Sequence, residues 1–324
     1  MVFKRPIRVQ EWVFLLRGAK GDLGENHSAK KGGRYSETQD CLITIPKGGE
    51  AMAVITVSRQ VGSLGTEIAR ESARCLNYEY VDKEKLEQLL KVFGFPEPQM
   101  EKFDEKKPPF WDSLSLERRK FLHATQAVLY DLASKDRAII VGRGGQALLK
   151  DVPGTLHLRI IAPFEKRVKR MVEAGGFDEK QATRFLRQSD QDSSGYIQTF
   201  FHVNWDDPSV YHLIINTADL SVETAAKIIT DAALSSDVTG KENLAREKLS
   251  ELALVQKVEA KLMDVLGTDV RNVEVEAKKG TVLLRGAVVS ARSRENCEKA
   301  VAALEGVQKV ENQMTISQYY RYGP

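Results

Sequence analysis

A short segment near residue 60 combines residue types that hold phosphate groups in nucleotide-binding proteins. Glycines permit a tight turn and the close approach of an anion, and the first N–H groups of a following helix lack partners within that helix. Thr66 takes the Ser/Thr position of a Walker A loop, where its hydroxyl would bind Mg²⁺ carried by the nucleotide. The candidate nucleotide-binding residues are Ser58, Arg59, Gln60, Gly62, Ser63, Gly65 and Thr66.

The loop departs from the Walker A pattern at its lysine position and at its first glycine position. Gly65 stands at the lysine position, and Arg59 stands at the first glycine position. A guanidinium can hold phosphate oxygens at two points, so Arg59 is the natural substitute cation. The alternative is that Gly62 and Gly65 only permit a tight turn between a strand and a helix. These residues alone leave both interpretations open.

Alternating elements predict the scaffold that must position this loop. Apolar, β-branched runs predict buried strands, and amphipathic segments between them predict helices, which together indicate a three-layer α/β domain with a parallel sheet. The expected strands are 53–57, 79–81, 137–142, 156–162 and 211–216, and the expected helices are 67–76, 83–92, 116–134, 163–173, 178–189 and 221–233. Ser221 is the expected N-cap of the last helix.

The remaining segments predict a second, smaller domain. A helix at 244–266, a hairpin at 273–277 and 282–288, a helix at 290–304 and a strand at 307–316 give the order α-β-β-α-β, a small α+β domain. We expect a flexible N-terminal extension at 1–50, a P-loop domain at 51–234, a linker at 235–246, the α+β domain at 247–318 and a tail at 319–324. Met52 is a candidate native start.

Several motifs in the first domain occur in an order that resembles a known family. They read VITVSRQVGSLGTEIA, YVDKE, AIIVGRGGQALL, LRIIAPFEKRVKRM and NWDDPSVYHLIINT. Over about residues 53–233 the chain resembles the cytidylate kinase-like family, a branch of the P-loop nucleoside monophosphate kinases. The resemblance implies ATP and Mg²⁺ as cofactors and a nucleoside monophosphate or similar small molecule as phosphoryl acceptor. That family also has Ser-Arg-Gln in the loop and no Walker lysine.

The resemblance and the strand ends suggest further site residues. Arg143 follows a buried strand, and open α/β sheets bind ligands at the carboxyl ends of strands. We expect Arg143, Asp82 and Lys83 to bind the acceptor, although Asp82 could instead cap a helix and Lys83 could face solvent. Arg184 and Arg187 share a helix face before the lid segment and join Arg59 as catalytic candidates, because lid arginines stabilise charge on the transferring phosphoryl group.

Two departures from the family pattern leave both an active and an inactive enzyme as interpretations. Gly144 stands where true cytidylate kinases have the aspartate of Gly-Arg-Asp, and no arginine occurs between Ser189 and Gly195. Trp205 is expected to anchor a turn. The basic side chains of the helix at 163–173 spread around more than one face, so most of them are expected to be solvated.

The second domain resembles the BON domain. The motif VEVEAKKGTVLLRGAVVSARSRENCEKAVAALEGVQKVEN carries this resemblance. The segment contains no acid–base pair, metal cluster or nucleophile arrangement. It is expected to bind a lipid, another small ligand or a protein partner, or to serve in assembly.

Composition limits the remaining function classes. A net charge of +3 gives no strong nucleic-acid signal, and no apolar run approaches the roughly 20 residues of a membrane helix. Three widely spaced cysteines and no histidine pair predict neither a disulfide framework nor a zinc site. The N-terminal patch is short for an export signal. We expect a cytoplasmic protein, for which a homo-oligomer is an option.

The function therefore has competing interpretations. The first is an enzyme that transfers a phosphoryl group from ATP to a nucleoside monophosphate or similar acceptor. The second is a nucleotide sensor with weak or no turnover, whose BON domain binds a ligand or partner. A structural protein with a vestigial pocket is the third, and we place the enzyme first.

Overall fold

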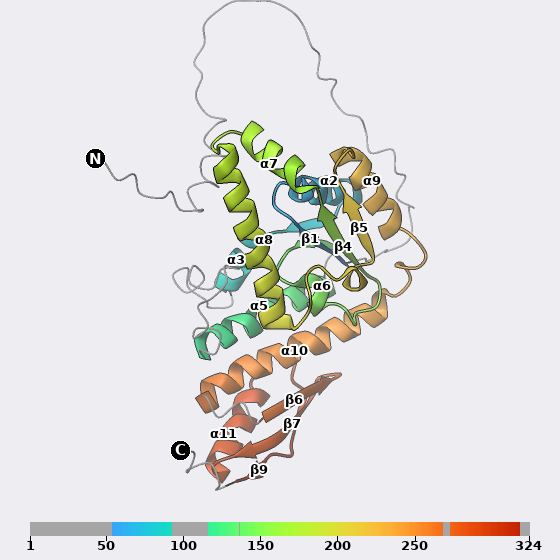
Figure 1. Ribbon diagram of the computed structural model, residues 1–324. Coiled ribbons are helices and arrows are strands. Elements are labelled where there is room, and N and C mark those ends of the chain that lie inside the picture. The colour runs from blue at the N-terminus through green and yellow to red at the C-terminus, as the bar shows by residue number, and fades with distance from the viewer. Residues whose placement is uncertain (1–53, 93–115, 136, 268–272, 318–324) are drawn as a thin grey trace, which may run out of the picture. The chain divides into compact units, whose positions relative to one another are not determined.

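A parallel sheet of five strands forms the centre of the N-terminal domain in the computed structural model, which describes residues 54–92, 116–135, 137–267 and 273–317 (Figure 1). The strands are β1 (Val54–Arg59), β2 (Glu79–Val81), β3 (Ala138–Val141), β4 (Thr155–Ile161) and β5 (Leu213–Asn216). Their order is β2-β3-β1-β4-β5, with every pairing parallel. The expected parallel sheet is thus confirmed. The expected extension at 1–50 and tail at 319–324 lie outside the described residues.

Helices cover both faces of this sheet, as a three-layer domain requires. Ile55 and Val57 of β1 face a core that includes side chains of α2 (Gly65–Leu76) and α9 (Val222–Ala233). The opposite core includes side chains of α3 (Lys83–Val92), α5 (Leu116–Lys135), α6 (Gly145–Leu148) and α10 (Glu242–Leu266). As expected, the Ser221 hydroxyl accepts a hydrogen bond from Thr224 N at 3.1 Å and so caps α9.

Two helices that follow β4 pack against each other. They are α7 (Phe164–Glu173) and α8 (Glu179–Phe201), and the turn η2 (Pro208–Val210) comes after them. The α8 helix was expected to end at 189, but it continues for twelve more residues. A capping box between Asp178 and Gln181 starts it, and buried Tyr196 and Ile197 hold its second half. His202, in the left-handed conformation, ends it.

The C-terminal domain contains a mixed sheet and one short helix. Its elements are β6 (Val273–Lys278), β7 (Thr281–Val288), α11 (Ala291–Ala302), β8 (Lys309–Asn312) and β9 (Thr315–Ile316). β6 and β7 form an antiparallel hairpin, and β7 pairs in parallel with β8 and β9. Lys279 and Gly280 make the hairpin turn with positive φ angles of 48° and 78°. The single final strand expected at 307–316 is therefore two short strands.

One long helix contributes to two hydrophobic cores. In α10, Leu249 and Ala253 belong to the core that α5 shares with the parallel sheet. Leu254, Val258 and Leu262 belong to the core of the C-terminal sheet. The helix begins at Glu242, inside the segment expected to be a linker, and it packs along α5 (Figure 1). The exact domain boundaries stay a prediction.

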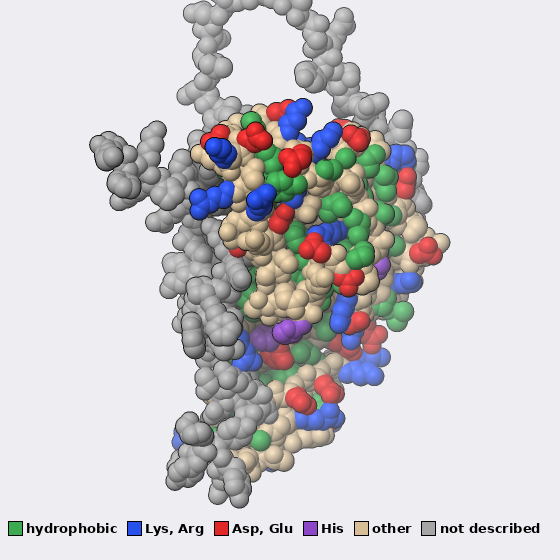
Figure 2. All heavy atoms as spheres, viewed as in Figure 1, with side chains coloured by type: hydrophobic (Ala, Val, Ile, Leu, Met, Phe, Trp, Pro, Cys, Tyr) green, Lys and Arg blue, Asp and Glu red, His purple; other side chains and the backbone are tan. Residues whose placement is uncertain are grey.

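Surface charge and the cysteines complete the description. Lysine and arginine are interspersed with acidic side chains on the face shown in Figure 2, rather than gathered by sign. Cys297 is free and buried, whereas Cys75 is disulfide-bonded, which was not expected from the cysteine spacing. Within the described ranges, no helix is both long and apolar enough to span a membrane.

Candidate functional site

The loop after β1 has a backbone shape that two glycines make possible. Gly62 has a φ of 78°, and Leu64, the N-cap of α2, also lies in the left-handed region with a φ of 61°. Leu64 offers no side-chain cap, so the first N–H groups of α2 remain available to an anion. Ser63 is fully buried, and its hydroxyl donates to Gln60 O at 2.7 Å. Ser63 thus shapes the loop from inside.

Gly65 and Arg59 are sterically linked. A Cβ added at Gly65 would lie 2.5 Å from Cβ of Arg59, so any side chain at 65 collides with the arginine. Arg59 is half-buried, and its guanidinium forms no hydrogen bond or ion pair with another described residue. The geometry therefore explains why a lysine is missing at the Walker position of a loop that carries an arginine at 59.

Two arginines of α7 hold the carbonyl side of the loop. Arg170 donates from Nη1 to Gly62 O at 3.1 Å and from Nη2 to Thr217 O at 2.5 Å. Arg167 donates from Nη1 to Val61 O at 3.3 Å. Thr217 completes this support by donating from Oγ1 to Ser63 O at 2.8 Å. These hydrogen bonds fix the carbonyl groups of Val61, Gly62 and Ser63.

This role of α7 was missed from the sequence. Most of its basic side chains were expected to be solvated, which is true of Lys166 and Lys169. The expectation is wrong for Arg167, which is 3% exposed, and for half-buried Arg170. These arginines are buried or half-buried because α7 packs closely against the loop. A Cβ at Gly62 would lie only 3.1 Å from Cβ of Arg167.

Arg167 also connects the loop to α8. Its Nη1 and Nη2 atoms pair with the two carboxylate oxygens of Asp190 at 3.0 and 2.7 Å. Arg167 and Arg187 both lie over the ring of Phe164, at 5.2 and 5.6 Å from its centroid. Arg187 is exposed and so is Arg184, and the two line one shallow hollow of α8. The structure thus places Arg187 against the helix that holds the loop.

The loop after β3 contains the first acceptor candidate. Arg143 is buried and has a φ of 58°, and Gly144 follows with a φ of 70°. A Cβ at Gly144 would lie 2.2 Å from Cε2 of Phe201, at the end of α8. An aspartate at 144 would therefore displace the Phe201 ring, which gives a physical reason for its absence.

The other two acceptor candidates make local contacts. Asp82 accepts a hydrogen bond from Lys85 N at 3.0 Å, as a helix N-cap does, and it lies 3.9 Å from a nitrogen of Arg70. Lys83 lies 3.7 Å from a carboxylate oxygen of Glu87. This geometry favours the capping role for Asp82, and acceptor binding by either residue stays a prediction.

A buried arginine on β4 supports the turn around Trp205. The guanidinium of Arg159 lies 4.3 Å from the centroid of the Trp205 ring and 2.5 Å from a carboxylate oxygen of Asp206. Trp205 donates from Nε1 to the hydroxyl of Ser58 at 2.7 Å, which fits its expected role as an anchor. Ser58 is buried, and its hydroxyl is engaged here rather than on the phosphate side of the loop. Arg159 was missed, although a cation within an apolar strand was a usable signal.

The sheet, the glycine loop and α2 together define a kinase-like P-loop nucleotide-binding domain. A family model, the cytidylate kinase-like family, matches residues 54–219, and the BON domain model matches residues 250–318. The chain belongs to the cytidylate kinase-like family and carries a BON domain after it, as its motifs predicted.

Individual proteins similar to this chain share a low sequence identity with it. A cytidylate kinase from Pyrobaculum islandicum is 25% identical over 184 residues, which cover 56% of this chain and 92% of that protein. A uronate isomerase from Corynebacterium glutamicum is 29% identical over 99 residues, 31% of this chain, and the match spans only 19% of that protein. Among solved structures, a shikimate kinase from Acinetobacter baumannii is 16% identical with a TM-score of 0.35, covering 57% of this chain and 95% of that one.

Proposed function

We propose that the chain binds ATP with Mg²⁺ on the Arg59–Thr66 loop and transfers a phosphoryl group to a nucleoside monophosphate or a similar small acceptor. The observation that carries the proposal is half-buried Arg59, whose Cβ and Cγ lie beside Gly65 at the uncapped start of α2. Its guanidinium forms no hydrogen bond or ion pair with another described residue. A cation in this position fits the phosphates of a nucleotide.

The residues in and around the loop have different roles in the proposed site. Arg59 and the N–H groups of Gly65 and Thr66 hold phosphate oxygens, while Arg167 and Arg170 keep the loop in shape from behind. The Thr66 hydroxyl, half-buried and without a partner among the described residues, would hold Mg²⁺ through the bound nucleotide. When bound, the ion neutralises charge on the phosphates.

The remaining candidates act around the transferred group. Arg187, and Arg184 beside it on α8, would stabilise charge that develops on the phosphoryl group. Arg143, Asp82 and Lys83 would bind the acceptor at the ends of β3 and β2. The acceptor-binding roles follow from position at the carboxyl ends of parallel strands, where ligands bind in open α/β sheets.

The second candidate function is a nucleotide sensor with little or no turnover. The α8 helix runs without a break through the segment that resembles a lid, and Phe201 packs on Gly144 beside the acceptor candidates. The BON domain would then bind a lipid, a small ligand or a partner. We place either activity in the cytoplasm.

Titration calorimetry with ATP and Mg²⁺, followed by an ADP-release assay over a set of nucleoside monophosphates, tests both functions. The enzyme predicts binding and ADP release that depends on one acceptor, whereas the sensor predicts binding alone. Arg59→Gln should weaken ATP binding by about tenfold or more, since charge-assisted hydrogen bonds are lost. Lys169→Gln, an exposed position on α7, is the matched control and should bind as the wild type does. Wild-type protein that fails to bind ATP would reject both functions.

A further inference from the structure

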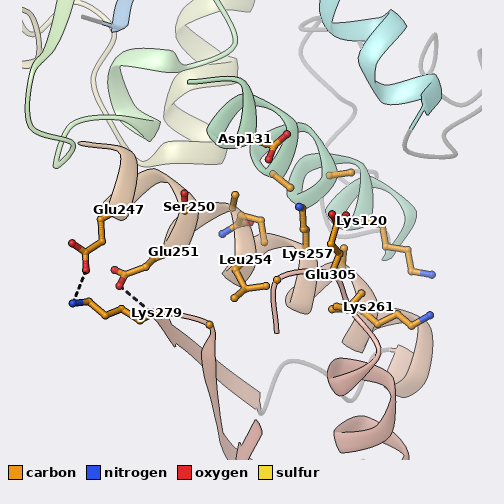
Figure 3. A pocket seen from close by; sticks show the side chains of 18 of the residues that line it. Lys120, Asp131, Glu247, Ser250, Glu251, Leu254, Lys257, Lys261, Lys279 and Glu305 are labelled. Atoms are coloured by element: carbon orange, nitrogen blue, oxygen red, sulfur yellow. Dashed lines mark hydrogen bonds and ion pairs between the residues drawn. The ribbon is translucent and has the colours of Figure 1, made fainter. Parts of the chain in front are cut away.

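A cavity of about 890 Å³ lies along α10, between α5 and two turns of the C-terminal domain (Figure 3). The turns are those at Gly280 and Gly306. No residue of the Arg59–Thr66 loop lines this cavity, so it is separate from the nucleotide site. Its volume falls within the range of sites that bind small molecules.

Small side chains keep the cavity open and make part of its wall apolar. Ala124 and Ala127 on α5 and Ala253 and Ala260 on α10 all line it. Leu254, which belongs to the core of the C-terminal domain, adds further apolar surface. A wall of methyl groups suits the hydrocarbon or ring portion of a ligand, because burial of apolar surface favours binding.

Most acidic side chains of the cavity already have partners. Lys279 lies 3.3 Å from Glu247, and its peptide N–H donates to Glu251 at 3.3 Å. Lys120 pairs with Asp264 at 2.5 Å near the other end. Asp131 also has an interaction partner. Glu305 is exposed and is the one acidic residue of the lining that has no partner among the described residues.

Two lysines that line the cavity have no acidic partner among the described residues. Lys257 and Lys261 are one turn apart on α10, both are half-buried, and neither forms a hydrogen bond or ion pair with another described residue. Figure 3 shows Lys257 reaching into the space between α5 and α10. A half-buried lysine that has no counter-ion and lies beside an apolar wall attracts an anion more strongly than a fully exposed lysine does.

We infer that this cavity binds a small organic anion with an apolar body. The anionic group lies against Lys257, with the charge of Lys261 one turn further along α10, and the apolar body covers the alanine and leucine wall. Because α10 contributes to both hydrophobic cores and α5 to the first, the ligand contacts both domains at once. It stabilises the contact between the kinase-like domain and the BON domain, independently of whether the loop binds ATP.

The dye 8-anilinonaphthalene-1-sulfonate, which has an aromatic body and one sulfonate, tests this inference on the full-length protein by fluorescence titration. We expect one site, whose affinity falls about tenfold in a Lys257→Gln/Lys261→Gln variant, as the loss of two partly buried ion pairs implies. Glu305→Gln removes the opposing charge and should raise the affinity. Lys248→Gln, on the same helix outside this cavity, is the matched control and should not change it.

Two further measurements separate the charge from the cavity itself. The uncharged analogue N-phenyl-1-naphthylamine should bind the wild type and the double lysine variant equally. Ala260→Leu, which fills part of the space from a half-buried position, should weaken both dyes. Equal affinity of the sulfonate dye for the wild type and the double lysine variant would overturn the inference, and so would equal affinity for the correctly folded Ala260→Leu protein. Competition with octanoate and with AMP then tells an aliphatic acid from a nucleotide as the source of the anion.

Discussion

Arg167 and Asp190 form a two-point ion pair that joins the support of the phosphate loop to the middle of α8. Nη1–Oδ1 and Nη2–Oδ2 are 3.0 and 2.7 Å apart, and the side chain of Arg167 is only 4% exposed. The Nε atom of Arg167 is buried without a hydrogen-bond partner in the described part of the chain. The carboxylate of Asp190 therefore provides most of the interactions that balance the buried charge of Arg167. A movement of α8 therefore changes the environment of the arginine that holds the loop.

Asp190→Asn is expected to destabilise the protein by roughly 3 kcal/mol, because it leaves the Arg167 charge buried without a counter-ion. Chemical denaturation measures the change in the free energy of unfolding. Asp192→Asn, on the same helix and hydrogen-bonded only to Gln188 within the described chain, is the control and should cost under about 1 kcal/mol. Equal losses in the two variants would show that the Arg167–Asp190 pair has no special weight.

The same pair shows where prediction from sequence stops. The strand before the loop, its glycines and the Ser221 cap depend on neighbouring residues, and all were predictable from local pattern. Arg167 and Asp190 are 23 residues apart on different helices, and nothing local distinguishes Arg167 from exposed Lys166 beside it. Which basic side chain is buried depends on how α7 meets the loop.

The link between Gly65 and Arg59 gives a prediction about restoring the Walker lysine. Gly65→Lys alone should destabilise the protein by about 1–3 kcal/mol, because the new Cβ would lie 2.5 Å from Cβ of Arg59. Adding Arg59→Ala keeps that Cβ and should rescue little, whereas adding Arg59→Gly removes it and should recover most of the stability. Thermal unfolding of the three variants measures this order. Full rescue by Arg59→Ala would place the conflict in the outer part of the arginine instead.

Gly144 and Phe201 make a comparable prediction at the other end of α8. Gly144→Asp should cost about 1–3 kcal/mol, since its Cβ would lie 2.2 Å from the Phe201 ring and its φ of 70° disfavours side chains. Phe201→Ala in the same protein removes the ring and should recover part of the loss, leaving the backbone strain. A double-mutant cycle by chemical denaturation measures this coupling. Strictly additive losses would mean that the ring moves aside without cost.

The buried polar stripe on β1 and β4 predicts how stability changes with pH. His157 is 3% exposed, accepts or donates a hydrogen bond with Thr56 Oγ1 at 2.8 Å, and stacks on His212 at 4.8 Å between ring centroids. Burial first, and then the charge of His212, lower the pKa of His157 to about 4 from its usual 6.5. Between these two values the unfolded chain binds a proton that the folded chain does not bind at this histidine.

The free energy of unfolding should therefore fall by roughly 3 kcal/mol, through His157 alone, as the pH is lowered from 6.5 to 4. Above pH 6.5, His157 should not make stability depend on pH. His157→Gln removes the titrating group, so its free energy of unfolding should depend less on pH in that window. His202→Asn, at the exposed end of α8, is the control and should keep the wild-type slope, since asparagine tolerates the left-handed conformation found there. Denaturant titrations at several pH values give the slopes. A His157→Gln slope equal to that of the wild type would assign the acid sensitivity to other groups.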